Sequence, residues 1–133
     1  LLLYNFFYVR HGVKLGKTPA MAELEAAAMS GTTGHVHRAS VAYGTSMAHK
    51  ALSHMSTPMG CSELAGKAYM KGPPTGWQRG FGIVHLLAGG KVHQYPVVTD
   101  GGVCVAEGHV FSKTRDIKPQ DTQVNWLANF TLP

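Results

Sequence analysis

The sequence predicts a mixed α/β (α+β) domain, and three stretches carry this prediction. Residues 2–9 form an apolar and aromatic run, which is typical of a strand buried on both faces. Thr18-Pro19 combines a capping hydroxyl with a proline at the first helical position, so a helix should begin there. After Trp77, apolar residues alternate loosely on both sides of Gly89-Gly90, which indicates a β-hairpin.

Length and composition limit the chain to one globular domain. It has 133 residues, of which 44% are hydrophobic and 14% are charged, so disorder of the whole chain is excluded. The net charge of +5 is compatible with phosphate esters or nucleic acid, although the basic residues form no block. Two cysteines are too few for a disulfide scaffold, and we interpret them as thiols of a reducing compartment.

No apolar run is long enough to cross a bilayer. The opening Leu1-Leu2-Leu3 has no basic segment before it and no cleavage site after it, so it does not fit a signal peptide. We therefore expect a protein of the cytoplasm, in a bacterium or in a host cell. The first residue is leucine and opens directly into an apolar strand, as would be expected if the chain had been cut from a larger domain.

The first strand should end at Arg10-His11-Gly12. Open α/β sheets place their sites beyond the carboxyl ends of buried strands, so His11 is a candidate site residue. In the helix that follows, apolar residues at helical spacing should face the sheet, two glutamates should lie near the positive end of the helix dipole, and a Ser-Gly pair should end it. These residues are Met21, Leu24 and Ala28, then Glu23 and Glu25, then Ser30-Gly31.

The middle of the chain carries weaker signals. Residues 39–43 favour a short strand, and residues 46–54 suggest a short helix followed by a loop. A further helical turn is expected within 62–70, and a loop at 72–76. The methionines at positions 47, 55 and 59 are interpreted as core residues.

The last third predicts β structure. Residues 80–88 and 91–98 should pair around Gly89-Gly90, and one or two further short strands are expected from residues 103–106 and 109–111. The domain is therefore predicted to span residues 1–111. Residues 112–133 should form an extended tail that docks only through Trp126, Leu127 and Phe130.

Gly34-His35-Val36-His37-Arg38 is the strongest chemical motif. Two imidazoles one residue apart, directly after a glycine, can reach one small volume, and neutral imidazole is the commonest metal ligand in proteins. With His11 upstream, they form a candidate metal site. The competing interpretation is a set of turn or surface histidines without a metal. The other histidines show no spacing that converges on a metal, and His85 with His93 is interpreted as a surface pair across the hairpin.

The order of these motifs resembles the calcineurin-like metallophosphoesterase superfamily, most closely its bacteriophage and environmental members. An apolar strand ending in His11-Gly12 precedes a helix and the Gly-His-x-His motif, and Trp77 with Gly80-Phe81 follows. The resemblance covers roughly residues 3–111. It implies the C-terminal half of a two-layer β sandwich with flanking helices.

The same resemblance implies a site with two divalent metal ions, manganese, zinc or iron. By position, His11 and His35 resemble ligands of the second metal, and His37 resembles a ligand of the first. Arg38 lies beside them in the sequence and is a candidate for binding a phosphate oxygen. The implied activity is hydrolysis of phosphomonoesters or phosphodiesters, with nucleic acid among the candidate substrates.

The family's Asp-x-His, Gly-Asp and Gly-Asn-His-Asp/Glu segments do not occur in this sequence. The acidic residues of the chain match none of them: Glu23, Glu25, Glu63, Asp100, Glu107, Asp116 and Asp121. We therefore expect a fragment or one subunit of a split enzyme, inactive alone and holding one metal ion or none. Its partner would be a chain that supplies the carboxylates, or a second copy that covers an exposed sheet edge.

Two alternatives remain open. The chain could be a non-catalytic interaction or structural module, such as a viral structural or assembly component, that keeps the fold without the two-metal chemistry. It could also hold a single structural zinc ion through His11, His35 and His37 together with a water.

Overall fold

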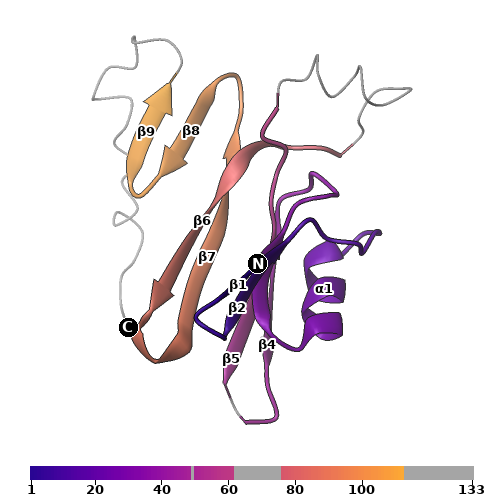
Figure 1. The fold of residues 1–133 in the computed structure, drawn as a ribbon. Coiled ribbons are helices and arrows are strands. Elements are labelled where there is room, and N and C mark those ends of the chain that lie inside the picture. The colour runs from indigo at the N-terminus through magenta and orange to yellow at the C-terminus, as the bar shows by residue number, and fades with distance from the viewer. Residues whose placement is uncertain (49, 62–75, 113–133) are drawn as a thin grey trace, which may run out of the picture.

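One mixed β-sheet, one helix and two hairpins make up the protein in a computed structural model that describes residues 1–48, 50–61 and 76–112 (Figure 1). The sheet has five strands in the order β1-β2-β3-β5-β4. Their bounds are β1 Leu2–Leu3, β2 Phe7–Arg10, β3 Ser30–Thr33, β4 Ser40–Thr45 and β5 Ala51–Ser56. The mixed α+β class is confirmed.

The centre of this sheet is parallel. β2 pairs with β3 and β3 pairs with β5 in parallel, whereas β1 and β4 lie antiparallel at the two edges. Helix α1 connects β2 to β3 and packs against β3, β4 and β5. Because neighbouring parallel strands end at the same edge of a sheet, the segments that follow β2 and β3 are brought together.

Helix α1 spans Pro19–Ala27, with proline in its first turn as predicted. The hydroxyl of Thr18 makes no capping hydrogen bond, and the helix ends at Ala28, whose left-handed conformation (φ 49°) lets its N–H donate to Leu24. The buried apolar face consists of Ala20 and Leu24, which pack against Ala42, whereas Met21 is exposed. The expected end at Ser30-Gly31 is wrong, since both residues belong to β3.

The first predicted strand is interrupted. Tyr4 and Asn5 adopt positive φ angles, so residues 2–10 fold back on themselves as the antiparallel pair β1 and β2. The predicted strand at 39–43 is confirmed as β4. The predicted helix at 46–54 is wrong, because β5 begins at Ala51 and its side chains alternate between the two faces of the sheet instead of forming one helical stripe.

The predicted hairpin around Gly89-Gly90 is confirmed, and the region where one or two short strands were expected forms two strands that pair with each other. β6 (Arg79–Leu87) pairs with β7 (Lys91–Thr99) across the turn Ala88–Gly90, and β8 (Val103–Ala106) pairs with β9 (His109–Ser112). The expected helical turn within 62–70 and the tail docking through Trp126, Leu127 and Phe130 lie outside the described residues. So does most of the expected loop at 72–76.

The β6–β7 hairpin covers the face of the sheet opposite α1 (Figure 1). Gln94 of β7 is buried, and its amide donates to the carbonyl of Gly31 (3.2 Å) and to the hydroxyl of Ser53 (2.9 Å). Met55 is fully buried on this side against Gly82 of β6. Met55 and Met59 are core residues as predicted, whereas Met47 is exposed. Within the described residues, no helix has the length and apolar character needed to cross a membrane.

Candidate metal centre

His11 and His35 meet at the carboxyl edge of the parallel strands. His11 follows β2, and His35 follows β3 after Gly34. The two rings lie with centroids 4.8 Å apart, and Nε2 of His11 is 2.9 Å from Nδ1 of His35. The structure therefore brings together two of the three histidines that the sequence singled out.

The separation of these two nitrogens suits a hydrogen bond, and it equally suits two ligands of one cation. Two nitrogens that each coordinate an ion at about 2.1 Å, roughly at a right angle, lie about 3 Å apart. His11 is exposed and His35 is half-buried, so an ion can reach both from solvent. The pair supplies two imidazole nitrogens, a common type of ligand for divalent transition metals.

The backbone of the Gly-His-x-His motif is strained at both histidines. His35 (φ 61°) and His37 (φ 55°) occupy the left-handed region, which residues with a side chain rarely adopt. A tight turn accompanies this strain, because the N–H of Val36 donates to the carbonyl of Gly34 at 2.7 Å. Such conformations cost about 1–3 kcal/mol each and concentrate at functional sites.

The ring of His37 packs against Trp77. The two ring centroids are 4.3 Å apart. Burial, and then the nearby His35 and His11, hold the pKa of His37 below its usual value, so its imidazole is neutral near pH 7. The carbonyl of His37 accepts from the backbone N–H of Gln78 at 2.9 Å, which fixes the turn to the start of β6.

Arg38 is exposed and bridges two loops. Its guanidinium donates to the carbonyl of Gly16 at 3.2 Å. The side chain of Gln78 accepts from the N–H of Ala39 at 2.8 Å and so holds the residues on either side of Arg38 in place. Arg38 is therefore anchored near the histidine turn, with its charge available to solvent.

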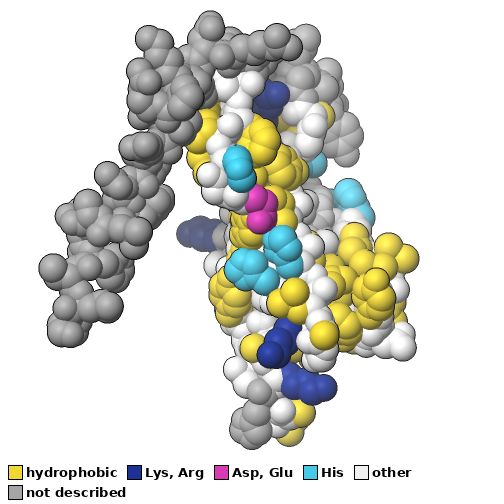
Figure 2. Space-filling view, turned by 90° about the vertical axis from the view of Figure 1, so that its left-hand side faces the viewer, with side chains coloured by type: hydrophobic (Ala, Val, Ile, Leu, Met, Phe, Trp, Pro, Cys, Tyr) yellow, Lys and Arg dark blue, Asp and Glu magenta, His cyan; other side chains and the backbone are white. Residues whose placement is uncertain are grey.

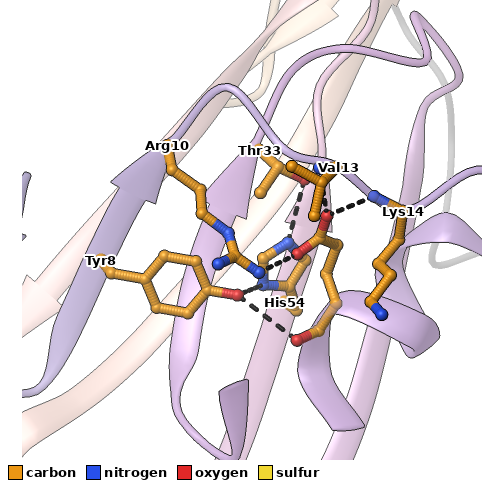
Figure 3. A network of polar contacts seen from close by, with 7 residues as sticks. Tyr8, Arg10, Val13, Lys14, Thr33 and His54 are labelled. Carbon is orange, nitrogen blue, oxygen red and sulfur yellow. Dashed lines mark hydrogen bonds and ion pairs between the residues drawn. The ribbon is translucent and has the colours of Figure 1, made fainter. Parts of the chain in front are cut away.

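The loop that carries His11 is held by the buried carboxylate of Glu23 (Figure 3). The side chain is 1% exposed, and Oε1 accepts from the N–H of Val13 (2.8 Å) and of Lys14 (2.9 Å), while Oε2 pairs with Arg10. Burial alone would raise the pKa of Glu23, but the two backbone donors and Arg10 outweigh it and lower the pKa to about 2. Glu23 is thus an ionised loop anchor, whereas the sequence had suggested only a dipole interaction.

A second buried group, His54, supports the same region (Figure 3). It has no solvent exposure, and its ring nitrogens contact the hydroxyls of Tyr8 (3.0 Å) and Thr33 (3.1 Å). Burial lowers the pKa of His54 to about 4, so it is a neutral hydrogen-bonding bridge between β2, β3 and β5. The sequence did not single it out, since it gave no sign that the segment was a buried strand.

Three residues of the site region were missed by sequence reasoning: Glu23, His54 and Gln78. Glu23 did carry a usable signal. It shares a helical face with Ala20 and Leu24, and a carboxylate on the apolar face of a helix must have a buried partner. Gln78 and His54 lacked such a signal, because their partners come from distant parts of the chain.

No group of three or more His, Cys, Asp or Glu side chains that could hold a metal ion is found among residues 1–48, 50–61 and 76–112. Comparisons with protein families, with curated proteins and with solved structures give no match to this chain. The candidate site is therefore defined by the His11–His35 pair, by the strained turn at His35 and His37, and by the hydrogen bonds of the buried Glu23 and His54.

Proposed function

We propose that this chain carries the last two metal-binding motifs of a metal-dependent phosphoesterase of the calcineurin-like type. The observation that supports this most directly is the 2.9 Å approach of His11 Nε2 to His35 Nδ1, beyond adjacent parallel strands. The sheet with α1 on one face and the β6–β7 hairpin on the other is compatible with half of a two-layer sandwich.

Each residue of the candidate site has its own role in this proposal. His11 and His35 would hold one divalent ion, and His37 would contribute its imidazole to a neighbouring ion. Arg38 binds a phosphate oxygen of the substrate. A divalent ion bound there polarises a phosphoryl oxygen and lowers the pKa of a bound water, which is the chemistry that phosphoester hydrolysis requires.

The carboxylates of this site come from outside the sequence. The carboxylate of Glu23, behind the loop that carries His11, is already occupied by Arg10 and two backbone donors. We therefore propose a partner chain, or a preceding segment, that supplies the Asp-x-His, Gly-Asp and Gly-Asn-His motifs. The substrate is a phosphomonoester or phosphodiester, and the basic net charge of +5 favours such anions.

Reconstitution tests this proposal. The chain is mixed with the protein segment encoded ahead of it or beside it that carries the three missing motifs, and hydrolysis of a nitrophenyl phosphodiester is followed with Mn²⁺. Activity should appear only in the mixture and should be lost in the His35→Ala variant, whereas His109→Ala, an exposed histidine elsewhere, should retain it. A mixture that binds tightly but hydrolyses nothing would contradict the proposal.

A non-catalytic module is the second candidate, because His11 and His35 can satisfy each other by a hydrogen bond without any metal. In that case a zinc titration of the chain leaves both rings unchanged. A single structural zinc would instead give one equivalent bound and no hydrolysis after mixing.

A further inference from the structure

The loop between β2 and α1 exposes two large aliphatic side chains. Residues 13–18 all lie at the surface, where Val13 is 68% exposed and Leu15 is 71% exposed. The loop projects beside the start of α1, on the right-hand side of Figure 1. Single exposed aliphatic residues are common on proteins, but two of them so close together in one loop form a local apolar surface.

Basic side chains accompany these two residues. Lys14 lies between them in the sequence and Lys17 follows. The guanidinium of Arg38 reaches the same loop and donates to the carbonyl of Gly16 at 3.2 Å. Within the part of the chain that the structure describes, no carboxylate forms an ion pair with any of these three cations. The loop therefore combines exposed apolar surface with positive charge that no described carboxylate neutralises.

Hydrogen bonds hold the backbone of this loop in place. The buried carboxylate of Glu23 accepts from the N–H groups of Val13 (2.8 Å) and Lys14 (2.9 Å), as Figure 3 shows, and Arg38 binds the carbonyl of Gly16. A loop that is ordered in advance loses less conformational entropy when a partner covers its side chains. The loop is thus built to present its side chains outwards from a fixed backbone.

The opposite side of the molecule has a different character. Figure 2 shows histidine side chains gathered around an acidic side chain there. His85 and His93 are cross-strand partners, and the exposed carboxylate of Glu107 lies 3.1 Å from Nε2 of His85. Hydrogen bonds from Tyr95 and then from His85 hold the pKa of Glu107 below its usual value, so this carboxylate is ionised and repels anions. An anionic surface is therefore favoured on the side of the β2–α1 loop.

We propose that the β2–α1 loop docks on the surface of an anionic phospholipid bilayer. Val13 and Leu15 enter the boundary between headgroups and acyl chains, while Lys14, Lys17 and Arg38 lie at the level of the lipid phosphates. The protein lies on the membrane and does not cross it. Aliphatic side chains favour this partner over single-stranded nucleic acid, whose bases stack on aromatic rings. The proposal does not depend on the proposed phosphoesterase activity.

Vesicle sedimentation tests the proposal with the full chain. Vesicles of phosphatidylcholine alone are compared with vesicles of equal parts phosphatidylcholine and phosphatidylglycerol, at low ionic strength. The protein should sediment with the anionic vesicles and stay in solution with the neutral ones, and added salt should release it because it screens the charges. Failure to sediment with the anionic vesicles would overturn the proposal.

Two variants separate the apolar contribution from the electrostatic one. Leu15→Ser should weaken binding to the anionic vesicles about tenfold, because an aliphatic side chain is no longer withdrawn from water. Lys14→Ala should weaken it about fivefold, the usual contribution of one cation near an anionic lipid surface. Circular dichroism of each variant confirms that the fold is retained.

The matched controls are Met47→Ser and Lys50→Ala. Both residues are exposed and lie between β4 and β5, at the opposite edge of the sheet from the β2–α1 loop. Both variants should leave vesicle binding unchanged. Equal losses in Leu15→Ser and Met47→Ser would contradict the docking surface. Binding of a single-stranded oligonucleotide in place of the vesicles, weakened by Lys14→Ala and unaffected by Leu15→Ser, would also overturn the proposal.

Discussion

At the scale of single residues, Gly12 is closely packed in the loop that follows His11. It adopts φ +95°, and a Cβ atom there would lie 3.0 Å from Cβ of Thr33 and 3.5 Å from the Glu23 carboxylate. Gly16 in the same loop has φ +119°, but a Cβ atom there would meet nothing within 4 Å. Alanine substitutions at these two glycines therefore distinguish the cost of the positive φ angle from the cost of crowding by Thr33 and Glu23.

Gly12→Ala should lower the free energy of unfolding by about 1 kcal/mol more than Gly16→Ala, because only the first adds a clash to the unfavourable φ. It should also weaken zinc binding, since the loop that carries His11 must move. Urea unfolding and zinc titration of both variants measure the two effects. Equal losses of stability in the two variants would show that Thr33 and Glu23 do not define the loop.

His54 makes stability depend on pH. Its pKa is about 4 in the folded protein and near 6.5 when unfolded, so between these values the unfolded chain binds the extra proton. The stabilisation is complete above pH 6.5 and is lost progressively as the pH falls towards 4, and the total loss is about 3 kcal/mol. His54→Gln should flatten the stability curve in this window, as measured by urea unfolding from pH 7 to 4.

The control is His109→Gln, which removes an exposed histidine and should leave that slope unchanged. A stability curve for His54→Gln that still falls steeply between pH 6.5 and 4.5 would mean that another group is titrating.

Glu23 affects stability at lower pH. Its pKa of about 2 lies below the unfolded value of 4.5, so its stabilisation is full above pH 4.5 and is lost as the pH falls towards 2.

At the scale of elements, sequence reasoning missed β3 and misassigned β5, although β3 leads to His35 and β5 carries the supporting His54. β3 reads Ser-Gly-Thr-Thr, with no large apolar residue, yet all four residues are buried. β5 contains Ser53 and His54, which are buried only because Gln94 and Tyr8 satisfy them. Local pattern cannot reveal such strands, since their polar groups are satisfied by partners 41 and 46 residues away.

The elements with local signals were predicted well. The Pro-initiated helix and the β6–β7 hairpin depend on neighbouring residues, and both were confirmed. His11 and His35 were singled out as candidates from the His-Gly and Gly-His-x-His patterns alone. The two rings come together only because β3 pairs with β2, and the sequence around each histidine gives no sign of that pairing.

Gly31 permits β3 to lie under Tyr8. A Cβ atom at Gly31 would lie 2.5 Å from the Tyr8 ring, which is rigid and hydrogen-bonded to His54. A Cβ atom at Gly82 would lie 2.4 Å from Cε of Met55, the end of a flexible side chain. Gly31→Ala should therefore cost about 1–3 kcal/mol more than Gly82→Ala in chemical unfolding. The reverse order would indicate that the Met55 core is the more tightly packed region.

At the scale of the whole molecule, the sheet has a free edge. β4 pairs only with β5 in the part of the chain that the structure describes, and its Tyr43 side chain is 67% exposed. Exposed strand edges favour pairing with another chain. We therefore expect the isolated chain to self-associate as its concentration rises, measured by sedimentation velocity.

Tyr43→Lys should reduce this association, because a charge on an edge strand disfavours pairing. Lys50→Ala, which changes an exposed residue just before β5, serves as the control and should leave it unchanged. Association that is equally strong in Tyr43→Lys would place the contact on another surface.

Anomalous diffraction from crystals grown with Zn²⁺ or Mn²⁺ tests the central claim most directly. We predict a metal peak at about 2.0–2.3 Å from both Nε2 of His11 and Nδ1 of His35, with the two rings still facing each other. A hydrogen bond that persists between these nitrogens in the presence of saturating metal, with no ion beside them, would contradict it.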